Sequence, residues 1–254
     1  MPLGAEITVF ERPHHQRIAH ILSSLNADIL ASHECWFGGG TSIALRYGEY
    51  RESIDMDFMV SNAEGYRELR GLLTKGDGIG PITRMGSQPL QLDREIRADQ
   101  YGIRTQIRMD GHSVKFEIVR EARISFEIPQ LEDCVCGVQT LTNLDLAASK
   151  ILANSDRYAD DGVFSRDIID LAMMSLKKPE LERAIEKSKH AYGPSVVTDL
   201  ARAIERLEQR QRQMCIRDSC MRTMDIQLPK AVIWEKIRRI RRNLKTAAQP
   251  NPTS

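Results

Sequence analysis

Two aspartates separated by one residue, Asp55 and Asp57, are the side chains of this sequence best placed to do chemistry. They lie in the run DMDFMV (Asp55–Val60), whose alternation is typical of a strand with one buried face. Residues two apart on a strand share a face, so both carboxylates would point one way and Met56 and Phe58 the other. Neighbouring carboxylates repel each other, and their oxygen atoms favour a divalent cation between them, most naturally Mg²⁺.

A glycine run precedes this strand by a helix-sized interval. Gly38, Gly39 and Gly40 have no Cβ atom, so their backbone N–H groups could approach a phosphate closely. Thr41 is predicted to cap the helix that follows, at residues 42–47, whose positive N-terminal end also favours an anion. The glycines, the hydroxyl, the helix and the two aspartates together predict chemistry on a phosphoryl group.

A third acidic candidate lies on a later strand. Residues 96–109 and 113–119 are extended runs on either side of Asp110-Gly111, a strong signal for a two-residue hairpin turn. Along the second run, Lys115 and Glu117 alternate with apolar residues. Glu117 is therefore either an ion-paired strand residue or a third carboxylate of the same metal site.

The stretch GGGTSIALRYGEYRESIDMDF, at residues 38–58, resembles the first motif of the AbiEii/AbiGii-type nucleotidyltransferase toxins, within the DNA polymerase β-like nucleotidyltransferase superfamily. That pattern is Gly-Gly-Thr/Ser, a helix, Arg-x-Ser and Asp-x-Asp-Phe. Here it reads Gly39-Gly40-Thr41, Arg51-Glu52-Ser53 and Asp55-Met56-Asp57-Phe58. A P-loop is excluded because there is no Gly-Lys-Ser/Thr, and a Rossmann motif is excluded because the glycine spacing is wrong.

Charged residues on two later helical segments form a second constellation. The segments AASKILANSDR and SRDIIDL are similar to the family's Ala-x-Lys and Arg-Asp-x-x-Asp-Leu helices. The resemblance implies that Lys150 reaches the triphosphate and that Asp167 orients Lys150 or the acceptor. Asp170, one turn beyond Asp167, could cap the helix or pair with Arg166. Taken alone, each of these residues, and Arg157 between them, is an ordinary solvated helix charge.

The resemblance implies transfer of a nucleoside monophosphate from a nucleoside triphosphate (NTP) to an acceptor hydroxyl, with the 3′ end of tRNA as the favoured acceptor. It also implies the toxin of a type IV toxin–antitoxin or phage-defence (abortive infection) system, with a cognate antitoxin encoded nearby. Mg²⁺ or Mn²⁺ would be held by the carboxylates of Asp55, Asp57 and Glu117, which are also catalytic residues. The further catalytic residues would be Lys150 and Asp167. The nucleotide would be bound by Gly39, Gly40, Thr41 and Lys150.

Two alternatives stay open at this stage. One is nucleotidyl transfer to a small molecule or a protein. The other is a non-catalytic nucleotide-binding regulatory module that kept the fold, although the presence of Asp55, Asp57 and Glu117 argues against the loss of catalysis.

Composition limits the class of protein. The 254 residues are 41% hydrophobic and 28% charged, as in ordinary globular proteins. Five cysteines without a Cys-x-x-Cys pair argue against a disulfide framework or a zinc ribbon and fit a reduced compartment. The first residues lack the apolar core of a signal peptide and no run reaches transmembrane length, so a cytoplasmic protein without a membrane partner is expected.

The net charge is +1, but the charged residues are unevenly distributed along the chain. Residues 201–245 carry 13 Lys/Arg against 5 Asp/Glu, a net of +8, which hints at a polyanionic partner. The predicted RNA contacts on this segment are Arg238, Arg239, Arg241 and Arg242. The hexapeptide MCIRDS at 214–219 resembles the translation of a sequencing adapter, so residues after about 213 carry little weight in the interpretation.

Periodicity predicts the elements that position these residues. Helices are expected at 13–31, 62–73, 141–153, 165–176, 179–188, 194–212 and 229–244, and a short strand at 35–37. With the resemblance, this pattern predicts an α+β fold with three parts. These are a polymerase β-like nucleotidyltransferase domain with a small mixed sheet at 1–138, a helical C-terminal domain at 139–245 and a disordered tail at 246–254.

Overall fold

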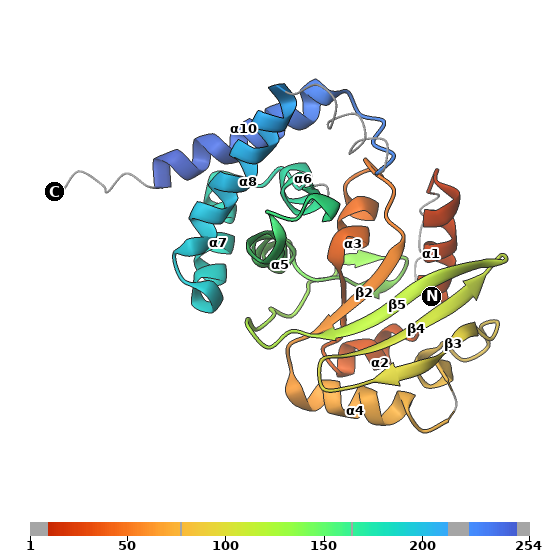
Figure 1. Ribbon diagram of the computed structural model, residues 1–254. Coiled ribbons are helices and arrows are strands. Elements are labelled where there is room, and N and C mark those ends of the chain that lie inside the picture. Colours follow the sequence, from red (N-terminus) through yellow and green to blue (C-terminus); the bar gives the residue numbers. More distant parts are fainter. Residues whose placement is uncertain (1–9, 77, 164, 213–223, 248–254) are drawn as a thin grey trace. The chain divides into compact units, whose positions relative to one another are not determined.

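The computed structural model describes residues 10–76, 78–163, 165–212 and 224–247. The chain divides into two compact units, Met1–Thr142 and Asn143–Ser254. The first contains the main sheet and the second is helical (Figure 1), so the predicted α+β class is confirmed. Cys215, Cys220 and the MCIRDS segment lie outside the described residues.

A five-stranded mixed sheet is the centre of the N-terminal unit. Its strand order is β1-β2-β5-β4-β3, and a separate hairpin pairs β6 with β7. Strands β2 and β5 are parallel, whereas the other neighbours in the main sheet are antiparallel. The strand bounds are β1 Trp36–Gly38, β2 Asp55–Val60, β3 Gln91–Ala98, β4 Gly102–Met109, β5 His112–Arg120, β6 Cys134–Val135 and β7 Val138–Gln139.

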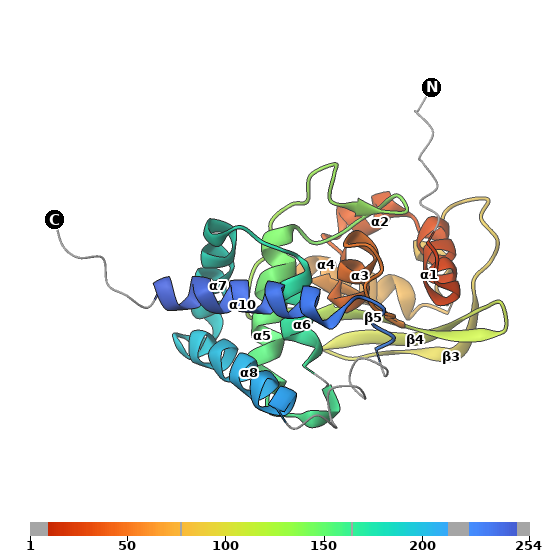
Figure 2. The same ribbon diagram turned by 90° about the horizontal axis from the view of Figure 1, so that it is seen from above.

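Helices cover one face of this sheet. The core joins buried residues of α1 (Pro13–Ser24), α2 (Ala27–Ser32) and α4 (Ala63–Leu73) to the inward residues of the strands. Figure 2 shows these helices on one side and β3–β5 on the other. Phe58 lies at the centre, with its ring centroid 5.3 Å from those of both Phe37 and Phe116. Because side chains alternate along β2, burial of Phe58 on the helix-covered face turns Asp55 and Asp57 to the opposite face.

The predicted helix at 13–31 is two helices, and its prediction as one was wrong. Leu25 is extended and forms a β-bridge with Thr83, which ends α1. Asn26 then caps α2, because its side chain accepts hydrogen bonds from the backbone N–H groups of Asp28 and Ile29.

The predicted strand at 96–109 is also divided. Asp99 Oδ1 accepts hydrogen bonds from the backbone N–H groups of Tyr101 and Gly102, which forms a turn between β3 and β4. The predicted hairpin at Asp110-Gly111 is confirmed: it joins β4 to β5, and both residues have positive φ, 49° and 76°.

The second unit is built from amphipathic helices. Helix α5 packs against α6, α7 and α8, and α10 packs against α6 and α8. Their bounds are α5 Asn143–Arg157, α6 Arg166–Met173, α7 Lys178–Tyr192, α8 Ser195–Arg212 and α10 Lys230–Ala247. Helix α10 therefore includes the first two residues of the predicted tail, and residues 248–254 lie outside the described part. None of the described helices combines the length and the apolar character needed to cross a membrane.

Candidate active site

The strand register brings the three predicted carboxylates to one face of the sheet. Asp57 on β2 lies directly opposite Glu117 on the parallel strand β5, and Asp55 lies opposite Lys115. Residues that are opposite each other on neighbouring strands point to the same side. All four side chains therefore lie on the face away from Phe58, as the alternation in the sequence predicted.

Glu117 is held by two cations. Its Oε2 atom is 2.5 Å from Lys115 Nζ, and its Oε1 atom is 3.1 Å from Arg104 Nε on β4. Partial burial acts to lower the pKa of Lys115, but the hydrogen bond to Glu117 and the charges of Glu117, Asp55 and Asp57 outweigh it and raise that pKa. The ammonium of Lys115 is thus stabilised by all three carboxylates.

The donor set suits a divalent metal, but its present arrangement is that of an ion-pair network. Three carboxylates on one face supply the oxygen ligands that Mg²⁺ and Mn²⁺ prefer. Among the residues that the structure describes, no three His, Cys, Asp or Glu side chains stand together as a ready metal cage. To act as a ligand, Glu117 would bind the ion beside, or in place of, Lys115 and Arg104.

The glycine run meets Asp57 directly. Helix α3 (Gly39–Arg46) begins right after β1, and Gly39 has φ +68°, a left-handed conformation that favours glycine. A Cβ atom on Gly39 would lie 2.5 Å from Asp57 Oδ2 and 2.9 Å from Asp57 Cβ. The N-terminus of α3, whose first N–H groups have no partner within the helix, is therefore placed against the carboxylate face.

Thr41 does not cap α3, and that prediction was wrong. The N-cap position is occupied by Gly38, and Thr41 lies inside the helix with 1% exposure. Its hydroxyl donates to the backbone oxygen of Asp55 at 2.5 Å and lies 2.8 Å from Ser53 Oγ. The side chain of Thr41 thus fixes the start of β2, and only its backbone N–H is oriented by the helix end.

His15 belongs to the same buried network and was missed in the sequence. The backbone N–H of Ser53 donates to His15 Nε2 at 3.1 Å, so Nδ1 carries the proton and donates to Glu49 Oε1 at 2.7 Å. Burial lowers the pKa of His15, and Glu49 only partly opposes this effect. Because 38 residues separate His15 from Ser53, no spacing rule relates them.

The second constellation forms a buried cluster inside the helical unit. Lys150 Nζ on α5 lies 3.1 Å from Asp167 Oδ1 and 2.7 Å from Asp170 Oδ2, both on α6. Arg157 donates two hydrogen bonds to the carboxylate of Asp167, of 2.7 and 2.9 Å. Burial acts to raise the pKa of Asp167, but Lys150 and Arg157 overcome this and hold it below its ordinary range.

This cluster refines the sequence interpretation. Asp167 contacts Lys150, which is the contact that one of its two predicted roles needs. Asp170 pairs with Lys150, whereas Arg166 Nε donates to the backbone oxygen of Val163, so the predicted Asp170–Arg166 pair was wrong. The Lys150 side chain is only 9% exposed, so it is not the solvated helix charge of the simpler interpretation.

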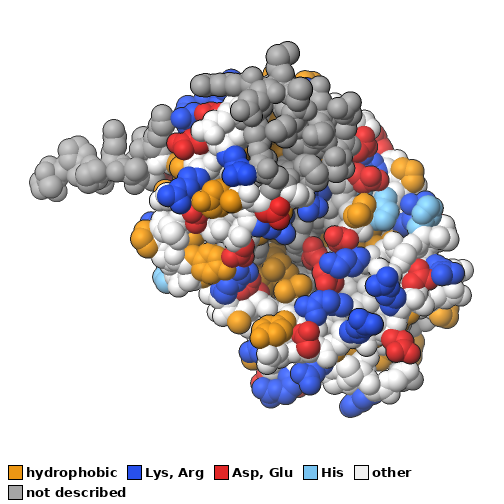
Figure 3. Space-filling model, viewed as in Figure 1, with side chains coloured by type: hydrophobic (Ala, Val, Ile, Leu, Met, Phe, Trp, Pro, Cys, Tyr) orange, Lys and Arg blue, Asp and Glu red, His pale blue; other side chains and the backbone are white. Residues whose placement is uncertain are grey.

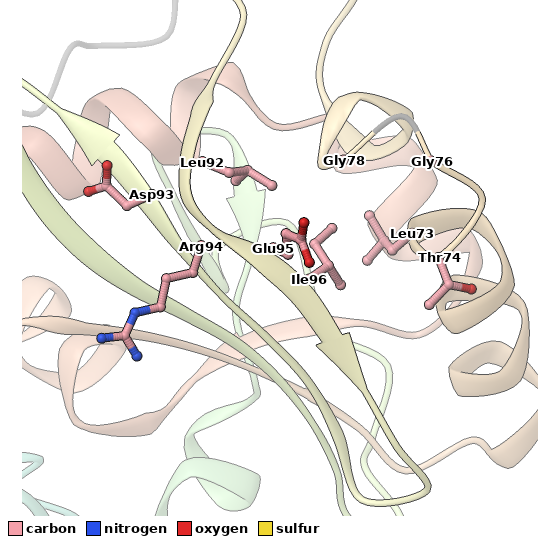
Figure 4. Close-up of a pocket in the computed structure, with 9 residues that line it drawn as sticks. All are labelled: Leu73, Thr74, Gly76, Gly78, Leu92, Asp93, Arg94, Glu95 and Ile96. Carbon is pink, nitrogen blue, oxygen red and sulfur yellow. The ribbon is translucent and has the colours of Figure 1, made fainter.

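A cleft of about 530 Å³ lies elsewhere on the N-terminal unit, between the end of α4 and β3. Figure 4 shows Leu73 and Ile96 facing each other across it. None of the predicted site residues lines this cleft.

Comparison with known proteins identifies the class to which the fold and this site belong. Residues 20–219 match the family model described as "Nucleotidyl transferase AbiEii toxin, Type IV TA system". Because the match covers most of the 254 residues, the chain belongs to this family of toxin nucleotidyltransferases, and the predicted family and enzyme class are confirmed.

Other comparisons add little. None of the curated proteins compared with the chain matches it. A crystal structure described as that of a "putative nucleotidyltransferase from H. pylori" is 16% identical and covers 93% of this chain and 97% of its own, with a TM-score of 0.45.

Proposed function

We propose that the chain transfers a nucleoside monophosphate from an NTP to an acceptor hydroxyl at the sheet face that carries Asp55, Asp57 and Glu117. The observation that carries this proposal is the register, which sets Asp57 opposite Glu117 and beside the N-terminus of α3. In the reaction, the acceptor oxygen attacks the α-phosphorus, the bond from that phosphorus to the β-phosphate oxygen breaks, and pyrophosphate leaves. The proton of the acceptor hydroxyl passes to water.

Asp55, Asp57 and Glu117 are the residues that would hold Mg²⁺ or Mn²⁺. Such an ion, when bound, lowers the pKa of an attacking hydroxyl and neutralises charge on the leaving pyrophosphate. The chain's own contribution is to fix the carboxylates. Thr41 bonds the backbone at Asp55, and Gly39 leaves the space that the Asp57 side chain fills.

The triphosphate would lie at the N-terminus of α3. Gly39, Gly40 and Thr41 offer first-turn N–H groups and the positive end of the helix, both of which favour phosphate oxygens. The Thr41 hydroxyl is already engaged with Asp55, so its part in this site is through the backbone.

Lys150 on α5 and Asp167 on α6 are further catalytic residues of this proposal. In this proposal Lys150 offsets charge that develops on the phosphates, and Asp167 and Asp170 orient its ammonium. The domain boundaries proposed are those expected from the sequence, 1–138 and 139–245.

The acceptor that we favour is the 3′ end of an RNA, in particular tRNA. The chain would act in the cytoplasm as the toxin of a type IV toxin–antitoxin or abortive-infection system, opposed by an antitoxin encoded nearby. Support for this part comes from the family to which the chain belongs.

The test is incubation with each α-labelled NTP, total tRNA and Mg²⁺ or Mn²⁺. We expect wild-type protein to label tRNA and both Asp57→Asn and Glu117→Gln to lose at least 100-fold in rate, since removal of one preorganised charge costs about 10²–10³. The matched control is Glu95→Gln, an exposed glutamate of β3, which should retain wild-type rate. Wild-type turnover in Asp57→Asn would exclude this site.

A further inference from the structure

The open face of the sheet changes its charge from β2 to β3. Its side near β3 carries four exposed arginines, here called the arginine face: Arg94 and Arg97 on β3, and Arg104 and Arg108 on β4. Figure 3 shows Lys and Arg side chains gathered over β3–β5, beside a group of acidic side chains. Positive and negative charge thus occupy neighbouring parts of one surface.

The register arranges these charges in two rows across the strands. Arg104 lies opposite both Glu117 and Arg97, while Gln106 lies opposite both Lys115 and Arg94. Each row therefore begins with an aspartate on β2 and ends with an arginine on β3: Asp57, Glu117, Arg104, Arg97 in the first, and Asp55, Lys115, Gln106, Arg94 in the second. Three interstrand spacings separate the ends, about 14 Å.

The two arginines of β3 are the uncompensated part of this surface. Arg104 pairs with Asp99 and Glu117, and Arg108 pairs with Asp93. Neither Arg94 nor Arg97 has an ion-pair partner among the described residues. In Figure 4, the side chain of Arg94 points away from those of Leu73 and Ile96.

The basic segment predicted to contact RNA is compensated to the same extent but belongs to another part of the chain. On α10, Arg241 pairs with Glu208 and Arg242 pairs with Glu235, as Arg104 and Arg108 are paired on the arginine face. Only the arginine face shares its sheet surface with Asp55, Asp57 and Glu117, because α10 lies in the helical unit. An exposed arginine with a nearby carboxylate offers less net attraction to a phosphate than an unpaired one.

We propose that the arginine face binds the phosphate backbone of the RNA acceptor, and that the acceptor end then lies at Asp55 and Asp57. This inference rests on the proposed function and specifies its acceptor site. At the spacing of about 3.4 Å per charge along one strand of duplex DNA, a span of about 14 Å covers about four phosphates. A triphosphate held at α3 would not need such a surface. The absence of large apolar side chains in either row favours a polyanion over a protein partner.

The test compares three double variants in binding to fluorescently labelled total tRNA without NTP. Arg94→Gln/Arg97→Gln removes two exposed charges from the arginine face. Arg67→Gln/Arg70→Gln removes two exposed charges from α4, which packs on the opposite face, and is the matched control. Arg238→Gln/Arg239→Gln does the same on α10. Anisotropy at 50 and 200 mM salt gives the slope of log affinity against log salt.

Each phosphate contact contributes about −0.7 to −0.9 to that slope. We expect the β3 pair to flatten it by about 1.4–1.8, so that between 50 and 200 mM salt wild-type protein loses about tenfold more affinity than this variant. The α4 pair should bind like wild type. Equal losses in the β3 and α4 pairs, a loss confined to the α10 pair, or no salt-dependent binding of tRNA by wild type would each overturn the assignment.

Failure of the proposed function is visible separately. If wild-type protein binds tRNA through Arg94 and Arg97 but transfers no label to it, the binding surface stands and the reaction is wrong. If label enters tRNA but the β3 pair binds and reacts like wild type, the reaction stands and the arginine face is not its acceptor site.

Discussion

Replacement of Gly39 by alanine should separate the fold of the N-terminal unit from its active-site geometry. Two costs follow from the structure. Alanine at φ +68° costs about 1–2 kcal/mol, and its Cβ would lie 2.5 Å from Asp57 Oδ2 and 2.9 Å from Asp57 Cβ. Overpacking of this kind adds about 1–3 kcal/mol, so the free energy of unfolding should fall by about 2–5 kcal/mol.

The activity of Gly39→Ala should fall further than its stability explains. Asp57 must move to make room, and a misplacement of about 1 Å can cost about 100-fold in rate. Urea unfolding gives the stability, and label transfer per folded molecule gives the activity. Gly111→Ala is the control, because Gly111 has φ +76° but nothing within 4 Å of an added Cβ. The Gly111→Ala protein should therefore lose only the roughly 1–2 kcal/mol that alanine costs at positive φ. If Gly39→Ala matches Gly111→Ala in both measurements, the contact with Asp57 does not matter.

Two further predictions concern buried charges. The pKa of His15 lies below its ordinary value of about 6.5, so the unfolded chain takes up a proton there before the folded chain does. The stabilisation from neutral His15 is therefore complete above about pH 6.5. As pH falls below that value, the free energy of unfolding decreases by up to about 1.4 kcal/mol per pH unit. Urea unfolding from pH 7.5 to 5.5 should show this slope and His15→Gln should reduce it; an unchanged slope refutes the assignment. Lys150→Met should cost about 3–5 kcal/mol by removing a partner from two buried carboxylates, against at most about 0.5 for exposed Lys178→Met. Adding Asp170→Asn should restore part of that loss, and equal costs for the two lysines would contradict the pairing.

The parts of the fold that sequence predicted well are those with strong local signals. Strand β2 occupies the predicted residues because strict alternation of acidic and apolar side chains leaves one register with a buried face. The β4–β5 hairpin was predictable because Asp110-Gly111 tolerates positive φ at both positions. Both signals lie within a few residues of the structure they determine.

What sequence did not reveal depends on contacts between distant residues. The break between α1 and α2 follows from a bridge between Leu25 and Thr83, which periodicity cannot detect. Strand β3 was merged with β4 because edge strands are largely exposed and their alternation is weak. The turn that divides the two strands begins at Asp99, with neither glycine nor proline in first place, so the sequence did not predict it.

In the candidate site, too, features set by local sequence were predictable and features set by distant contacts were not. The common face of Asp55, Asp57 and Glu117 follows from strand periodicity and was predictable. The roles of Thr41 and Asp170 were not, because each depends on which of several nearby polar groups the folded chain presents. Thr41 reaches Asp55 across 14 residues, and Asp170 reaches Lys150 on another helix.

The most direct test of nucleotidyl transfer at the sheet face is pyrophosphate release coupled to RNA labelling. Wild-type protein and Asp57→Asn are compared at equal folded concentration, with α-labelled NTP, total tRNA and Mg²⁺. We expect wild type to release one pyrophosphate for each nucleotide that enters tRNA, and Asp57→Asn to do neither at more than about one hundredth of that rate. Equal release and labelling by the two proteins would contradict the assignment of this site.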